Sequence, residues 1–194
     1  MSTTPLRLLF LSMDWYRTKD PRTPLAMASI QAFYEAHRQE VVLSSFISYD
    51  LANDQFNIDH VISSIIANRP DLIAWGTYIW NESQTQAIIQ ALIENKIPAK
   101  VILGGPQITF AGKELDQTYP RVDYFVKGSG EEPFVWLIDQ LAMGSSPDCD
   151  KMRKLCIYSR EMIASEDCRG IHTAALEGLV SPYLSGTIPI VQNQ

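Results

Sequence analysis

The chain has 194 residues, 46% of them hydrophobic and 20% charged, which is typical of one globular domain with a short extension. Its net charge of −6 argues against a nucleic-acid partner, because such binding depends on basic surfaces. Every apolar stretch is much shorter than the length of about 20 residues that is needed to span a bilayer. The N-terminus lacks a signal-peptide pattern. We therefore expect no membrane association and a cytoplasmic location. The odd number of cysteines agrees with a reducing compartment: Cys149, Cys156 and Cys168.

Short apolar runs alternate with helical patterns along the first 144 residues. The predicted strands are residues 6–13, 40–48, 71–80, 99–105 and 122–128. The predicted helices are residues 24–39, 57–70, 81–96, 111–120 and 130–144. Asn81 is expected to be the N-cap of the third helix, and Glu131 is expected to favour the positive end of the last one.

The first, third and fourth strands are nearly continuous apolar runs, which indicates strands that are covered on both faces. Such strands are typical of parallel sheets. Five βα units with right-handed crossovers predict an α/β fold with a doubly wound, five-stranded parallel sheet. Its expected strand order is 2-1-3-4-5, which is the flavodoxin-like (Rossmann-like) arrangement.

The character of the sequence changes after Gly144. A polar break at 145–154 precedes a short possible strand at 155–161, and the rest carries Gly and Pro without a helical period. We predict an α/β domain at residues 1–144 and a linker or docking tail at residues 145–194.

In a sheet of this kind, ligands bind beyond the carboxyl ends of the strands, where the strand order reverses. Three common occupants fit poorly. A phospho-receiver needs a carboxylate after the third strand, where the sequence reads WGTYIW. A flavodoxin needs a Gly- and hydroxyl-rich loop after the first strand, and a dinucleotide fold needs G-x-G-x-x-G there. The sequence SMDWYRTKDPR supplies neither.

Two glycines end the fourth predicted strand. We interpret Gly104 and Gly105 as a bare backbone edge on which a flat group can lie, because a Cβ there would collide with it. Thr77, across the crevice, offers a hydroxyl. Together they predict a slot beside the third and fourth strands, although the glycines are also compatible with an ordinary turn.

Residues 6–142 resemble the cobalamin-binding domain that precedes the catalytic barrel of cobalamin-dependent radical SAM enzymes. The resemblance is carried by VILGGPQITF followed by VDYFVKGSGEEPF, and SPYLSGTIP at 181–189 is similar to the linker that leads into that barrel. It implies a corrinoid ligand, with cobalt, whose nucleotide tail runs along the Gly-Gly loop.

The resemblance implies a set of cofactor-binding residues at the loops after the first, third, fourth and fifth strands. They are Asp14, Trp15, Tyr16, Thr77, Tyr78, Ile79, Gly104, Gly105, Pro106, Gln107, Gly128, Gly130 and Glu131. Tyr16 stands where the wider family has the histidine that ligates cobalt, and Lys19 stands where that family has a glycine. The resemblance therefore implies a corrinoid without a histidine lower ligand.

The cysteines are separated by six and eleven residues, so they do not form the C-x-x-x-C-x-x-C loop of a radical SAM cluster. We interpret the chain as an excised cobalamin domain or a separate subunit, which binds cofactor and presents it for methyl transfer or related radical chemistry. S-adenosylmethionine and the [4Fe–4S] cluster would belong to a missing barrel, in cis or in another subunit. Two alternatives are a degenerate domain that only docks, and a small-molecule enzyme, for which no nucleophile–base pair is present.

Overall fold

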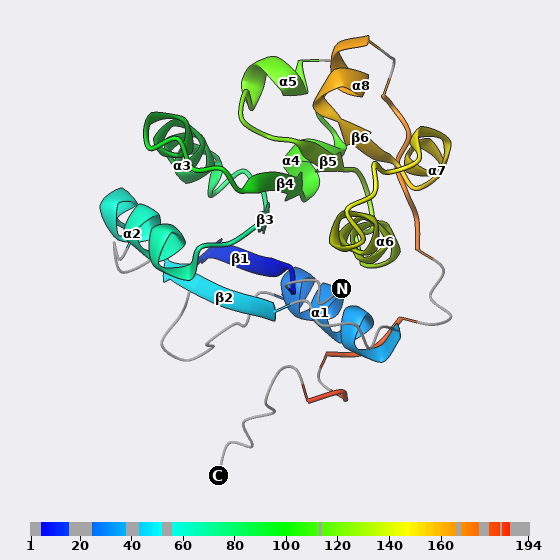
Figure 1. Ribbon diagram of the computed structural model, residues 1–194, viewed down its shortest axis with the longest axis horizontal. Coiled ribbons are helices and arrows are strands. Elements are labelled where there is room, and N and C mark those ends of the chain that lie inside the picture. Colours follow the sequence, from blue (N-terminus) through cyan, green and yellow to red (C-terminus); the bar gives the residue numbers. More distant parts are fainter. Residues whose placement is uncertain are drawn as a thin grey trace.

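The computed structural model describes residues 5–15, 25–37, 43–51, 56–112, 114–165, 168–174, 179–182 and 184–186. A six-stranded sheet in the order β2-β1-β3-β4-β5-β6 forms its centre (Figure 1). The strands are β1 (Arg7–Asp14), β2 (Leu43–Asp50), β3 (Leu72–Gly76), β4 (Lys100–Gly104), β5 (Tyr124–Val126) and β6 (Ile157–Ser159). The helices are α1 (Leu25–His37), α2 (Ile58–Asn68), α3 (Glu82–Glu94), α4 (Pro106–Thr109), α5 (Leu115–Thr118), α6 (Glu131–Ala142), α7 (Cys149–Lys154) and α8 (Arg160–Ser165).

The five strands β1 to β5 are parallel and lie in the predicted order 2-1-3-4-5. The predicted number of five strands is wrong, because β6 adds an antiparallel strand beside β5 with Val126 opposite Ile157. This strand lies in the segment that we predicted as a linker or docking tail. It has only three residues, and its place depends on a pairing with a distant segment. The division of the chain at residue 144 stays a prediction.

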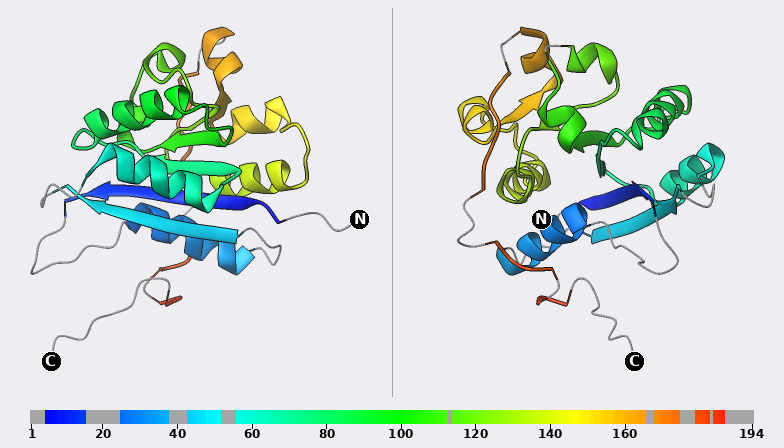
Figure 2. Two further views of the ribbon diagram at one scale, coloured as in Figure 1. Left: turned by 60° about the vertical axis from the view of Figure 1, so that its left-hand side comes forward. Right: turned by 180° about the vertical axis from the view of Figure 1, so that it is seen from behind.

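The central strands are covered on both faces, as their apolar sequences predict. Helices α2 and α3 lie over one face, and α1 and α6 lie over the other (Figure 2). Leu8 to Met13 of β1 and Leu72 to Trp75 of β3 are accordingly buried without interruption. The helices leave the carboxyl ends of the strands on one common edge of the sheet.

Two short helices follow β4. Pro106 begins the one-turn helix α4, between the strand predicted at 99–105 and the helix predicted at 111–120, and its fixed φ suits a first helical position. Helix α5 is confined to Leu115–Thr118, within the longer helix predicted at 111–120. Among the described residues, no helix combines the length and the apolar character needed to cross a membrane.

Candidate functional site

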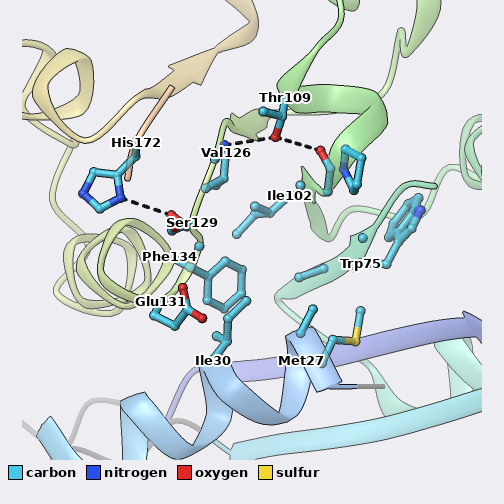
Figure 3. Close-up of a pocket in the computed structure, with 18 of the residues that line it drawn as sticks. Met27, Ile30, Trp75, Ile102, Thr109, Val126, Ser129, Glu131, Phe134 and His172 are labelled. Carbon is cyan, nitrogen blue, oxygen red and sulfur yellow. Dashed lines mark hydrogen bonds between the residues drawn. The ribbon is translucent and has the colours of Figure 1, made fainter. Parts of the chain in front are cut away.

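A cavity of about 510 Å³ lies between the sheet and helices α1 and α6, at the carboxyl ends of β3, β4 and β5 (Figure 3). Its volume falls within the roughly 300–1,000 Å³ that small-molecule sites occupy. The lining is predominantly apolar, and its side-chain polar groups come from Tyr78, Thr109, Ser129, Glu131 and His172. The cavity adjoins the switch point between β1 and β3, beside which doubly wound sheets bind ligands.

The floor of the cavity is made by two rows of residues that face the same side of the sheet. Phe10, Ala74 and Ile102 are neighbours across β1, β3 and β4 and form the first row. Two residues further along β3 and β4, Gly76 lies opposite Gly104, and this pair forms the second row. Because residues i and i+2 of a strand share a face, Gly104 leaves a hollow directly beside an apolar row, whereas the Tyr78 ring covers Gly76.

Helices α1 and α6 supply the walls. Met27 and Ile30 of α1 point toward the cavity, and Phe134 of α6 lies between them and the sheet (Figure 3). The rings of Phe134 and Phe10 are 5.6 Å apart, so wall and floor are in contact. The result is a hollow suited to a flat, apolar group.

Gly104 and Gly105 differ in what they accommodate. Gly105 has a φ of +93°, and a Cβ there would lie 2.7 Å from the carbonyl oxygen and 2.8 Å from the amide nitrogen of Thr77. The missing side chain at Gly105 therefore makes room for the protein's own backbone, which corrects our interpretation of that glycine. At Gly104 the nearest atom to a Cβ would be the Val126 carbonyl oxygen at 3.6 Å, an ordinary van der Waals distance, so a side chain fits here and would border the cavity.

Thr77 is completely buried and does not line the cavity. Its amide donates to the Gly104 carbonyl at 2.8 Å, and its carbonyl accepts from the Gln107 amide at 3.2 Å. Its hydroxyl, however, has no hydrogen-bond partner. A buried polar group without a partner is costly, because its lost hydrogen bonds to water are not replaced.

Removing the hydroxyl of Thr77 by substitution tests whether this group is unpaired. We expect Thr77→Val to leave the free energy of unfolding unchanged or to raise it by about 1 kcal/mol, because only an unpaired group is lost. The matched control is Thr109→Val, whose hydroxyl donates to the Gly105 carbonyl at 2.9 Å and accepts from the Gly128 amide at 3.0 Å. That variant should lose about 2 kcal/mol in urea denaturation, since a buried amide is left unpaired. An equal loss in the free energy of unfolding in both variants would contradict the conclusion that the Thr77 hydroxyl has no hydrogen-bond partner.

Tyr78 lies over the glycine row. Its ring would be 3.0 Å from a Cβ at Gly76 and stacks on the Trp80 ring at 4.5 Å. Burial, and to a lesser extent the negative charge of Asp14, raises the pKa of Tyr78. The phenol is therefore protonated at neutral pH and available as a hydrogen-bond donor.

Asn81 joins the ends of β1 and β3 at the switch point. Its side-chain amide donates to the carbonyls of Met13 at 3.2 Å and Gly76 at 3.1 Å, and its oxygen accepts from the Tyr78 amide at 2.8 Å. We expected Asn81 to cap α3. It does stand at the N-cap position, but its side chain makes no hydrogen bond to the helix.

The structure brings about half of the predicted site residues together. Those that line the cavity are Tyr78, Gly104, Gly105, Pro106, Gly128, Gly130 and Glu131. Those that lie outside its lining are Asp14, Trp15, Thr77, Ile79 and Gln107. Trp15 and Ile79 instead stand at the carboxyl edge, where they are 55% and 78% exposed. Tyr16 and Lys19 lie outside the described residues, so the expectation about the lower ligand stays a prediction.

Sequence reasoning missed several residues of the lining. They are Met27, Ile30, Gly76, Thr109, Phe134 and His172. The apolar residues of α1 and α6 have the spacing of an ordinary core stripe, so their pattern holds no signal for a cavity. His172 reaches the site through a contact with Ser129, 43 positions away in the sequence.

The fold and the site together define a doubly wound α/β domain with an apolar ligand cavity beside its switch point. Residues 19–138 match the B12 binding domain family, and the chain belongs to this family. A comparison with curated proteins found no match.

Solved structures share the fold. The cobalamin-dependent S-adenosylmethionine radical enzyme OxsB, with aqua-cobalamin and S-adenosylmethionine bound, matches with a TM-score of 0.57 and 17% identity over 73% of this chain. The match covers 19% of OxsB, so this chain corresponds to about a fifth of that protein. The methanol:cobalamin methyltransferase complex MtaBC from Methanosarcina barkeri matches with a TM-score of 0.49 and 10% identity, over 76% of this chain and 51% of that one.

Proposed function

We propose that this chain is the cobalamin-binding module of a radical SAM enzyme, and that the cavity beside β3 and β4 holds the nucleotide tail of the corrinoid. The observation that carries the proposal is the bare backbone position at Gly104, which lines the apolar cavity at the carboxyl edge of the sheet. The signature residues around Gly104 and Gly128, and the fold shared with OxsB, support the radical SAM context.

The residues present fit a corrinoid tail. A flat heterocyclic base suits the floor of Ala74 and Ile102, with Phe134, which packs against Phe10, as a side wall. The few polar side chains of the lining, those of Tyr78, Thr109, Ser129, Glu131 and His172, can orient the sugar and phosphate. A bound corrinoid supplies methyl-transfer or related radical chemistry, while the chain supplies binding and orientation.

Exposed apolar side chains border the carboxyl edge of the sheet and suit the broad corrin ring. Ile79 is 78% and Phe110 79% exposed, and Trp15 and Trp80 are also exposed. Large apolar side chains grouped on a surface mark contact sites. We assign Trp15, Ile79 and Trp80, which lie outside the cavity lining, to the ring, and the cavity, which Phe110 borders, to the tail.

Hydroxocobalamin binding tests the proposal. We expect purified full-length chain, mixed with hydroxocobalamin and passed through gel filtration, to elute with corrinoid absorbance in a stoichiometry of about one per chain. Elution without corrinoid absorbance would favour the alternative, a degenerate domain that only docks. The radical SAM context requires a C-x-x-x-C-x-x-C motif in the continuation of the coding sequence or in a co-purifying subunit.

The lower cobalt ligand provides a separate prediction. None of the three histidines of the chain, His37, His60 and His172, lies in the loop between β1 and α1. We therefore expect the electron paramagnetic resonance spectrum of the reduced cob(II)alamin complex to lack nitrogen hyperfine splitting from a histidine. Labelling the chain with ¹⁵N-histidine is the control, because a change in splitting would reveal a histidine ligand and contradict the prediction.

A further inference from the structure

Residues 168–174, here called the C-terminal strap, run beside β5 and the start of α6, beyond the residues that match the family. Two of them, Ile171 and His172, line the cavity. We propose that the strap is a specificity-determining wall of the cofactor site, required for binding the nucleotide tail. The inference rests on the proposed function, and it assigns a binding role to a part of the chain outside the B12 binding domain match.

Backbone hydrogen bonds fix the strap against the loop after β5. The amide of His172 donates to the Lys127 carbonyl at 2.9 Å, and the amide of Ser129 donates to the His172 carbonyl at 2.9 Å. Gly128 and His172 thereby form a parallel bridge. The imidazole Nδ1 of His172 also lies 3.2 Å from the Ser129 carbonyl oxygen, over the start of α6 (Figure 3). The contact thus has the geometry of an added strand.

The backbone conformation and the missing side chain of Gly128 accommodate the strap. It has a φ of +93°, and a Cβ there would collide with the carbonyl oxygen of His172 and lie 2.7 Å from its amide nitrogen. The absence of a side chain at Gly128 therefore admits another segment of the same chain. Since Gly128 itself lines the cavity, the strap and the cavity share a wall.

A buried lysine ties the beginning of the strap to the interior. Lys127 is 2% exposed, and its ammonium donates to the carbonyls of Cys168 at 2.9 Å and Ala111 at 3.1 Å. An ammonium group is expensive to bury unless it is hydrogen-bonded. Departure of the strap would remove the Cys168 carbonyl from this ammonium, so the docked position is favoured.

Ile171 gives the strap its contact with a ligand. The side chain is 47% exposed although it lines an apolar cavity, so a nucleotide tail in the cavity would cover it. Burial of that surface favours the docked strap and the bound tail together. Corrinoids that lack the nucleotide tail do not contact Ile171, so the strap does not contribute to their binding.

The test compares two corrinoids on the full-length chain: hydroxocobalamin, and the hydroxo form of cobinamide, which lacks the nucleotide tail. The variants are Ile171→Glu, which places a carboxylate in the apolar wall, and Gly128→Ala, which displaces the strap. The controls are Leu184→Glu, at a residue 89% exposed, and Gly144→Ala, at a glycine with φ +66° and no atom within 4 Å of a Cβ. Circular dichroism and urea denaturation check the fold of each variant.

We expect both strap variants to weaken hydroxocobalamin binding at least about tenfold, with cobinamide binding within about twofold of the parent chain. Hydrogen exchange at residues 168–174 should slow on adding hydroxocobalamin and stay unchanged with cobinamide. Parent-like hydroxocobalamin affinity in both variants, or equal weakening for both corrinoids, would overturn the inference and leave the proposed function standing. If the parent chain bound neither corrinoid, the proposed function would fail and the inference with it.

Discussion

Gly104→Leu is expected to abolish cofactor binding in a folded chain, with the Kd for hydroxocobalamin rising at least about 100-fold. Gly104 follows Ile102 by two positions on the face that forms the cavity floor, so a leucine there projects into the hollow. The fold should tolerate the change, because Gly104 is not among the glycines with positive φ and a Cβ meets its nearest atom at 3.6 Å. An absorbance titration measures the loss.

The matched control for this experiment is Gly112→Leu. Gly112 also has open space around a Cβ and no positive φ, but it does not line the cavity. We expect that variant to bind hydroxocobalamin with an affinity within about twofold of the parent chain. Retained binding in Gly104→Leu, with the native circular dichroism spectrum, would show that the tail does not enter this cavity.

Gly105→Ala is expected to lower the free energy of unfolding by about 3 kcal/mol. Of this, about 1 kcal/mol comes from placing a side chain at positive φ, and about 2 kcal/mol from contact with the backbone of Thr77. The added Cβ would push Thr77 away from Gly104, whose carbonyl accepts its amide, and loosen the junction between β3 and α4. Urea denaturation measures the difference.

Gly186→Ala separates the two contributions. Gly186 has a φ of +80° but no atom within 4 Å of a Cβ, so the variant carries the conformational cost alone. It should lose about 1 kcal/mol. If Gly105→Ala lost no more than Gly186→Ala, the close approach of Thr77 would not constrain position 105.

The parallel part of the fold was predictable because its determinants are local. Continuous apolar strands require cover on both faces, and right-handed crossovers leave few possible orders. The sixth strand was predictable only as a short possible strand at residues 155–161, and its place in the sheet was not predictable. Ile157–Ser159 is too short to show a period, and only its pairing with β5 makes it a strand of the sheet. One-turn helices such as α4 pose the same difficulty.

The sheet edge that carries the cavity was predictable, but the lining of the cavity only in part. Glycines at strand ends indicated the right edge of the sheet, yet the sequence could not distinguish Gly104, which opens onto the cavity, from Gly105, which accommodates Thr77. Gly76 could be assigned to the cavity only from its register with Gly104 in the sheet. His172 enters through a contact between segments far apart in the chain, which no local pattern encodes.

The side chain of Asn81 has a consequence for how a ligand enters. It is 1% exposed and clamps the carboxyl ends of β1 and β3 at a set spacing, in the place where a doubly wound sheet most easily splays apart. A crevice held in this way is preorganised, so little conformational entropy remains to be lost when it is filled. Association at this edge then requires no prior opening of the sheet, and its rate should be set by diffusion and orientation.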